Sequence, residues 1–101
     1  MRKMTIEMAK IYNTVLDRYE LLWQALRRLF EDLTKRKIQL GGNVAHNLRN
    51  CRSVINFTRS HVCPGCDLDT FDSEHLKLQE TLESIKRDLF LAAQIVGKEY
   101  L

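Results

Sequence analysis

The feature that most constrains this chain is a long run, from Ile6 to Ile38, that contains neither glycine nor proline. Its apolar stripe consists of Ile11, Val15, Leu16, Tyr19, Leu22, Trp23, Leu26, Leu29, Phe30 and Leu33. Intervals of one, three and four residues place these side chains along one face of an α-helix. Thr5 is a suitable N-terminal cap, and Gly41–Gly42 a suitable stop, because glycine tolerates the left-handed conformation that ends helices. The run therefore predicts one long first helix over 6–38.

Two further stretches repeat this periodicity. The stripe of the second is Val44, Leu48, Cys51, Ile55, Thr58 and Val62. The stripe of the third is Leu78, Leu82, Ile85, Leu89, Ala92 and Val96. Spacings of three and four residues predict a helix in each case. The chain is thus expected to be a single all-α domain over 1–101, a three-helix antiparallel bundle with a long first helix.

The boundaries of the second and third helices are expected at residues that cap or break helices. Asn43 is a good N-cap for the second helix, and Pro64 ends it, because the residue before a proline is pushed out of helical geometry. Asp72 or Ser73 is expected to cap the third helix, with Glu74 in its first turn.

The three helices predicted in this way differ in length, at roughly 50, 28 and 40 Å for a rise of 1.5 Å per residue. A monomeric bundle would then leave Trp23, Phe30, Phe90 and Leu91 partly exposed, and such apolar patches mark interfaces. The commonest closure is a two-fold homodimer, formed by the apolar end of the third helix and the stripe of the first. The alternative is that the first helix bends and covers these residues itself.

Charge and hydropathy indicate a cytoplasmic protein without a membrane segment. The apolar run 89–93 is far shorter than the ~20 residues that cross a bilayer, and no apolar stretch of the secretory type follows the basic start. The net charge of +3 is divided unevenly, because residues 1–66 are basic and residues 67–101 are acidic. The expected consequence is that the acidic third helix packs beside the basic segments, within the monomer or across a dimer.

Cys63-Pro64-Gly65-Cys66 falls at the corner between the second and third helices. Two thiols at this spacing suit half of a zinc site, completed by His61 and one more ligand or by the pair of a second protomer. The corner resembles the zinc hook of the coiled-coil DNA-repair ATPases, which implies dimerisation through a shared metal. The same spacing is also compatible with a disulfide or with two free thiols. Cys51, on the second stripe, is expected to be buried and to take no part.

A basic side of the second helix is formed by Arg49, Arg52 and Arg59, with no acidic residue between them. Together with Lys35, Arg36 and Lys37 at the end of the first helix, these arginines are candidate contacts to nucleic-acid phosphates. Arg27 and Arg28 would extend the patch if the fold brought them close. The same arginines could instead form a solvated helix face, or pair with acidic residues of the third helix, namely Glu80, Glu83 or Asp88.

The sequence contains no nucleophile–base–acid set, phosphate loop or paired histidine ligands, so we expect no catalysis. Residues 48–57 and the helix ending at 97–100 resemble small helical archaeal proteins of uncharacterised function, which implies a cytoplasmic helical protein and supplies no activity. The expected function is therefore helix pairing with itself or with a protein partner. The alternative is a small nucleic-acid-associated protein that uses the basic face, with or without structural zinc at Cys63 and Cys66.

Overall fold

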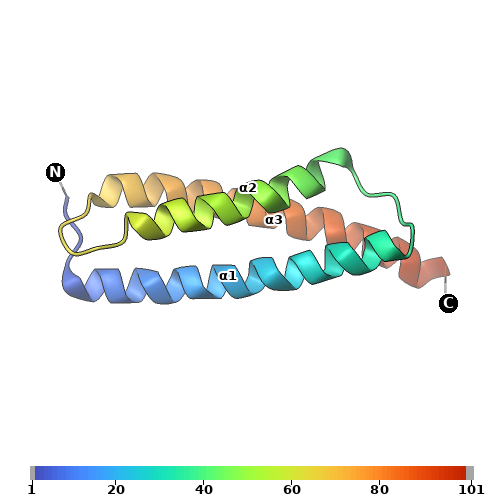
Figure 1. Ribbon diagram of the computed structural model, residues 1–101, viewed down its shortest axis with the longest axis horizontal. Coiled ribbons are helices and arrows are strands. Elements are labelled where there is room, and N and C mark those ends of the chain that lie inside the picture. The colour runs from blue at the N-terminus through green and yellow to red at the C-terminus, as the bar shows by residue number, and fades with distance from the viewer. Residues whose placement is uncertain (1, 100–101) are drawn as a thin grey trace.

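The computed structural model describes residues 2–99 and consists of three helices, α1 (Ile6–Lys35), α2 (Gly42–Ser60) and α3 (Leu68–Glu99). They run up, down and up, so that α2 is antiparallel to both neighbours and α1 and α3 point the same way (Figure 1). The bundle is rod-like, measuring 53 × 21 × 16 Å. The predicted all-α, three-helix antiparallel fold is confirmed. None of the helices over 2–99 combines the length and apolarity that crossing a membrane requires.

The core lies where the three predicted stripes meet along the axis of the bundle. The side chains of Leu16, Cys51, Ile55, Phe71, Leu78, Ile85 and Leu89 are almost completely shielded from solvent. Cys51 is fully buried, as its place on the stripe predicted. Thr58 is buried as well, and its hydroxyl donates to the Val54 carbonyl at 2.7 Å, so no polar atom is left unsatisfied there. Val96, the last residue of the third stripe, has its side chain outside the described part of the structure.

The start of α1 agrees with the prediction, whereas its end does not. The Thr5 hydroxyl accepts from the backbone N–H of Met8 at 3.1 Å. The helix stops at Lys35, before Gly41, because Lys37 adopts the left-handed conformation with φ of 60°. The Ile38 N–H then donates to the Leu33 carbonyl, a hydrogen bond that closes the helix end.

The N-cap of α2 lies two residues earlier than predicted. The helix begins at Gly42, with Gly41 in the N-cap position, and no side chain caps it. The prediction that Asn43 is the N-cap is therefore wrong. In its place, the Gly41 carbonyl accepts from the N–H of Val44 at 3.1 Å.

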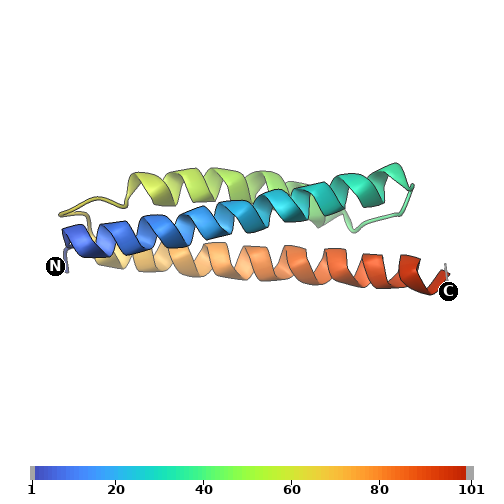
Figure 2. The same cartoon turned by 90° about the horizontal axis from the view of Figure 1, so that it is seen from below.

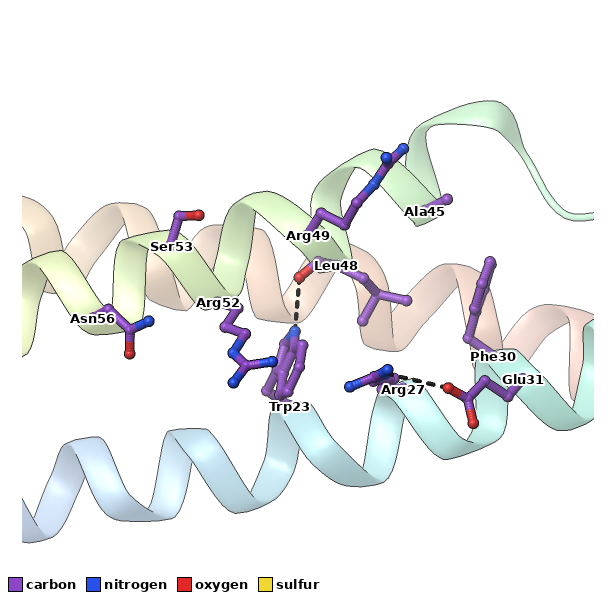
Figure 3. A pocket seen from close by; sticks show the side chains of 10 residues that line it. All are labelled: Trp23, Arg27, Phe30, Glu31, Ala45, Leu48, Arg49, Arg52, Ser53 and Asn56. Carbon is purple, nitrogen blue, oxygen red and sulfur yellow. Dashed lines mark hydrogen bonds and ion pairs between the residues drawn. The ribbon is translucent and has the colours of Figure 1, made fainter.

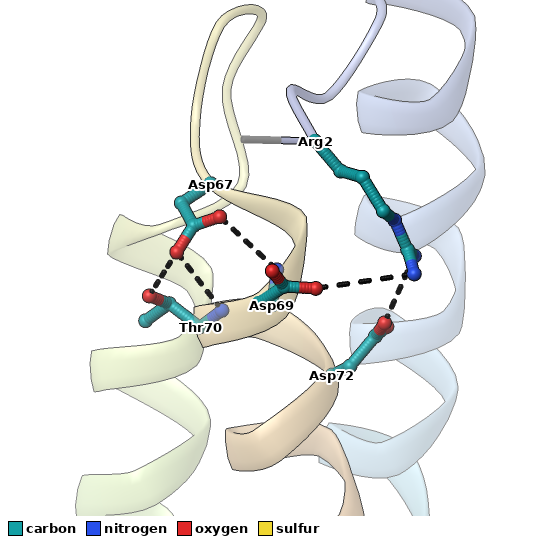
Figure 4. A network of polar contacts seen from close by, with 5 residues as sticks. All are labelled: Arg2, Asp67, Asp69, Thr70 and Asp72. Carbon is teal, nitrogen blue, oxygen red and sulfur yellow. Dashed lines mark hydrogen bonds and ion pairs between the residues drawn. The ribbon is translucent and has the colours of Figure 1, made fainter.

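The third helix begins at Leu68, about one turn earlier than the predicted cap at Asp72 or Ser73. The Asp67 carboxylate accepts from the backbone N–H groups of Asp69 and Thr70 at 3.2 and 3.3 Å, and from the Thr70 hydroxyl at 2.8 Å (Figure 4). The hydrogen bond from the Thr70 side chain lowers the pKa of the Asp67 carboxyl the most. Arg2 reaches across to Asp69 and Asp72, so the expected cap residue forms a surface ion pair instead.

The longer α3 and the 36–41 loop alter which apolar residues are exposed. Trp23 is 7% exposed and Phe30 is half-buried, so the expectation that Trp23 would be left uncovered is wrong. Ile38 and Leu40 of the loop pack against the core beyond the start of α2. Phe90 and Leu91, at 48% and 54% exposure, are uncovered as predicted.

Candidate functional site

A hydrogen bond between the first two helices organises the main candidate site. The indole N–H of Trp23 donates to the backbone carbonyl of Leu48 at 2.7 Å in a buried position (Figure 3). Trp23 belongs to the core stripe of α1, and Leu48 to that of α2, so both residues are brought to this contact by their apolar surroundings. The hydrogen bond holds the indole ring in one orientation at the junction of the helices.

Two arginines, one from each helix, lie against this indole. The guanidinium carbon of Arg27 is 5.6 Å from the ring centroid, and that of Arg52 is 5.4 Å from it. Arg27 follows Trp23 by one helical turn, and Arg52 follows Leu48 by one turn, so helix geometry places both beside the hydrogen bond. The two guanidinium groups are attracted by the electron-rich faces of the ring.

A groove of about 460 Å³ opens between α1 and α2 at this point. We call it the arginine groove, and define it by Trp23, Arg27, Arg49 and Arg52. The other residues that line it are Phe30, Glu31, Ala45, Leu48, Ser53 and Asn56. A second hollow of about 380 Å³ adjoins it, shares Trp23, Arg27 and Arg52, and adds Arg28. The groove therefore has an apolar wall and a cluster of arginines.

The charges of the groove are only partly neutralised. Arg27 forms an ion pair with Glu31 at 3.2 Å on the same helix. Among the side chains that the structure describes, no carboxylate lies within 4.0 Å of the guanidinium groups of Arg49 or Arg52. The predicted ion pairs of these two arginines with α3 are thus absent from the described structure. Arg28 also lines the adjoining hollow.

Arg59 is engaged with the first helix. Its guanidinium pairs with Asp17 at 3.0 Å and with Glu20 at 3.3 Å. The expectation that it pairs with the acidic residues of the third helix is therefore wrong, because this side of α2 faces α1. Two carboxylates neutralise Arg59 and leave little of its charge for a ligand.

The basic residues proposed for nucleic acid do not form one surface. Lys35, Arg36 and Lys37 are exposed at the end of α1 and line none of the described hollows. Arg36 pairs with Asp32 at 3.4 Å on its own helix. Arg27, Arg49 and Arg52 line the same groove and Arg28 lines the hollow beside it, whereas Lys35, Arg36, Lys37 and Arg59 line neither.

The Cys63–Cys66 corner contains a disulfide, one of the three arrangements with which its spacing is compatible. The two Cα atoms are 5.3 Å apart, and Gly65 between them has φ of 85°, which favours glycine. The loop binds the start of the chain, since the Met4 N–H donates to the Cys66 carbonyl and the Gly65 N–H donates to the Met4 carbonyl, both at 2.8 Å. The loop thus joins α2, α3 and the N-terminal segment.

The same corner does not present a zinc-binding set in this state. The disulfide sulfurs are not thiolates, which are the form that binds zinc. Nδ1 of His61 lies 2.9 Å from the Phe57 carbonyl oxygen. In the described part of the chain, no three His, Cys, Asp or Glu side chains come together in a way that could hold a metal ion.

A third feature is a shallow apolar hollow of about 320 Å³ between α1 and α3, on a different side from the arginine groove. Tyr19 and Leu22 of α1 and Leu76 and Leu82 of α3 line it. The Tyr19 hydroxyl is 2.8 Å from Nε2 of His75, and burial raises the pKa of Tyr19. Figure 2 shows α1 and α3 side by side over most of their length.

The sequence placed Trp23 on the apolar stripe of the first helix and did not connect it with the arginines. The signal was present as Arg27 one turn after Trp23, but the partner, Arg52, depends on how α1 and α2 are aligned. Comparison of the chain with known protein families, curated proteins and solved structures finds no match. The function must therefore be argued from these surfaces.

Proposed function

We propose that this protein is a non-catalytic helical module that forms a homodimer through the α1/α3 side of its bundle. The surface is an apolar seam, defined by Ile11, Leu22 and Leu29 of α1 and Leu76 and Phe90 of α3. The exposure of large apolar side chains on this seam is the observation that carries the proposal, with Ile11 at 60%, Leu76 at 56% and Phe90 at 48%.

Helical spacing places the residues of the seam on one face of each helix. Ile11, Leu22 and Leu29 are separated by 11 and 7 residues, and Leu76 and Phe90 by 14, so each set lies on one face of its helix. The two helices are parallel neighbours, so the two faces border the same hollow. An apolar strip of this kind favours association, and a two-fold axis would let two copies cover it at once.

This seam uses part of the dimer surface that the sequence suggested, since Ile11, Leu22 and Leu29 belong to the predicted stripe of α1. Other residues of that stripe, namely Leu16, Trp23, Leu26 and Leu33, are buried within the monomer. The contact must therefore use the stripe residues that remain accessible, of which Leu22 and Leu29 are half-buried. Charged residues lie between the apolar residues of the seam, with Arg18 on α1 and Glu80 and Glu83 on α3, and can pair across an antiparallel dimer.

Sedimentation velocity over micromolar to millimolar concentrations tests this proposal. We expect a species of twice the 11.9 kDa chain mass, and its dissociation in Phe90→Glu and Leu76→Glu. Phe57→Glu is the matched control, because Phe57 of α2 is also a half-exposed phenylalanine, at 49%, but lies off the seam. A monomer at every concentration, or equal effects of Phe57→Glu and Phe90→Glu, would contradict the seam.

Nucleic-acid binding, the alternative function, rests on fewer residues than the sequence suggested. Arg59 is neutralised by two carboxylates, and the cluster at the end of α1 is separate from Arg49 and Arg52. We therefore do not adopt it as the function. It becomes an outcome of the ligand experiment described below.

A further inference from the structure

We propose that the arginine groove binds a small organic phosphate, that is, a phosphate monoester on an apolar or aromatic body. This site lies between α1 and α2, whereas the proposed dimer seam lies between α1 and α3. The two proposals are therefore independent, and either can fail without the other.

Four arginines, two from each helix, line the groove and the hollow that adjoins it. Arg27 and Arg28 of α1 and Arg49 and Arg52 of α2 line the two adjoining hollows, together with the carboxylates Glu20 and Glu31. Four cations against two anions leave an excess of two positive charges, and Glu20 is already paired with Arg59. A phosphate monoester carries a charge of about −1.5 to −2 at pH 7, which matches this excess.

Two of the arginines are held in place by the protein itself, before any ligand binds. Arg27 and Arg52 both pack against the Trp23 indole, which is itself fixed by its hydrogen bond to Leu48. The planar guanidinium group offers paired N–H donors that fit phosphate oxygens. Less side-chain entropy is lost on binding when the donors are ordered beforehand.

The groove has the size and the apolar wall of a small-molecule site. A volume of about 460 Å³ is within the range of small-molecule sites. Phe30, Ala45 and Leu48 form an apolar wall beside the arginines, where the body of the ligand would pack (Figure 3). Hydroxyl and amide groups are supplied at the other end by Ser53 and Asn56.

These features favour a small ligand over a nucleic-acid strand. A strand requires an extended basic track and exposed aromatic rings on which successive bases stack. Here the basic patch is interrupted by Glu20 and Glu31, and Trp23 is 7% exposed, so its faces are covered by protein. The groove therefore has room for one anionic head group with a short body.

Glu31 is an anionic residue of the same site, so its replacement should change ligand affinity in the opposite direction to replacement of an arginine. Its carboxylate occupies the Nε donor of Arg27 at 3.2 Å and would repel a bound phosphate. Glu31→Gln removes that charge while keeping the shape of the side chain. The variant should therefore bind an anion more tightly than the natural protein.

The experiment uses the single tryptophan of the chain as its reporter. The full-length protein is titrated with phenyl phosphate, inorganic phosphate and phenol, and the indole N–H resonance of Trp23 is followed by NMR. We expect a saturable shift with phenyl phosphate, binding weaker by about tenfold or more with inorganic phosphate, and no saturation with phenol. Arg49→Met and Arg52→Met should each weaken binding by about tenfold, and Glu31→Gln should strengthen it severalfold.

Arg87→Met is the matched control, because Arg87 is an exposed arginine of α3 that lines neither hollow. It should leave the affinity unchanged, and circular dichroism should confirm that each variant is folded. No saturation by phenyl phosphate up to ~10 mM, or an equal loss in Arg87→Met, would overturn the proposal. Tight, steeply salt-dependent binding of a single-stranded oligonucleotide without binding of phenyl phosphate would also overturn it, in favour of nucleic-acid binding.

Discussion

Replacing Trp23 with phenylalanine should weaken the contact between α1 and α2 without changing the fold. The substitution removes the indole N–H that donates to the Leu48 carbonyl at 2.7 Å and keeps an aromatic ring in the same part of the core. The Leu48 carbonyl remains within α2, where it can keep its helical hydrogen bond. The loss is therefore one interhelical hydrogen bond and part of the attraction of Arg27 and Arg52 to the ring.

The magnitude follows from these contacts. A buried hydrogen bond contributes about 1 kcal/mol net, within a range of about 0.5–1.5 kcal/mol. Each contact of an arginine with an aromatic ring contributes about 0.5–1 kcal/mol at an exposed site, and phenylalanine is a weaker partner than tryptophan. We expect the free energy of unfolding to fall by about 1.5–2.5 kcal/mol, and the melting temperature of a chain of this length by roughly 6–12 °C.

Urea and thermal unfolding followed by circular dichroism at 222 nm measure this loss, because the variant has no tryptophan fluorescence. The double variant with Arg52→Met separates the two contributions, since contacting residues give non-additive effects of about 0.5 kcal/mol or more. A total loss below about 0.5 kcal/mol would refute the account of the hydrogen bond. Strict additivity of the two substitutions would refute the role of the indole in holding Arg52.

Other predictions concern the cysteines and the α3 cap. Cys51→Ala should cost about 1 kcal/mol from lost core volume, measured by urea unfolding, and native Cys51 should resist thiol reagents. Burial raises the pKa of Cys51 to about 12 from the 9.0 of an exposed thiol. The stabilisation from the buried, protonated thiol is therefore present below pH 9.0 and is lost as pH rises towards 12. Urea unfolding across that pH range measures this loss. Reducing the Cys63–Cys66 disulfide should lower the free energy of unfolding by about 2 kcal/mol, because the loop that it closes is short. The hydrogen-exchange rate of the Met4 amide should rise, since this amide donates to the Cys66 carbonyl. An unchanged exchange rate would contradict the role of the loop in holding the N-terminal segment. The pKa of Asp67 is lowered by its hydrogen bonds, so the ionised carboxylate stabilises the fold at neutral pH and this stabilisation is lost as pH falls through the folded pKa. In Asp67→Ala the free energy of unfolding should therefore depend less on pH in the acid range.

The core was predictable because it depends on spacing alone. Any helix that contains Leu48, Cys51 and Ile55 places them on one face, whatever it packs against. The same spacing places Leu78 and Ile85 on one face of α3, and these two residues are buried, as are the three of α2. A short chain with three helices of this kind buries the three apolar faces by packing them against one another in a bundle.

Helix boundaries were less predictable because several residues can serve as caps. Asp67 and Asp72 are equally suitable N-caps by type, and the choice is made by Thr70, whose hydroxyl and N–H both bind Asp67. Similarly, Lys37 adopts the left-handed conformation although a glycine pair follows it at 41–42. The preference for glycine at such positions is worth only about 1 kcal/mol, which contacts of the 36–41 loop can outweigh.

The candidate site depends on how α1 is aligned against α2, and the residue spacing within each helix does not determine this alignment. The sequence correctly grouped Arg52 and Arg59 on one side of α2, since they are seven residues apart. The contact of Trp23 with Leu48 then fixes the antiparallel alignment, and residues that follow Leu48 must lie opposite residues that precede Trp23.

That single alignment explains why two arginines of one helix face have different surroundings. Arg59 lies two turns beyond Arg52 and so falls opposite Asp17 and Glu20, which neutralise it. Arg52 packs against Trp23, beside Arg27, which follows Trp23 by one turn. No carboxylate of the described side chains lies within 4.0 Å of the Arg52 guanidinium. A shift of two turns between the helices would place Arg52, in place of Arg59, opposite Asp17 and Glu20. The groove is therefore a consequence of the core register, and a substitution that disrupts the Trp23–Leu48 hydrogen bond should reduce both the stability of the bundle and its affinity for phenyl phosphate.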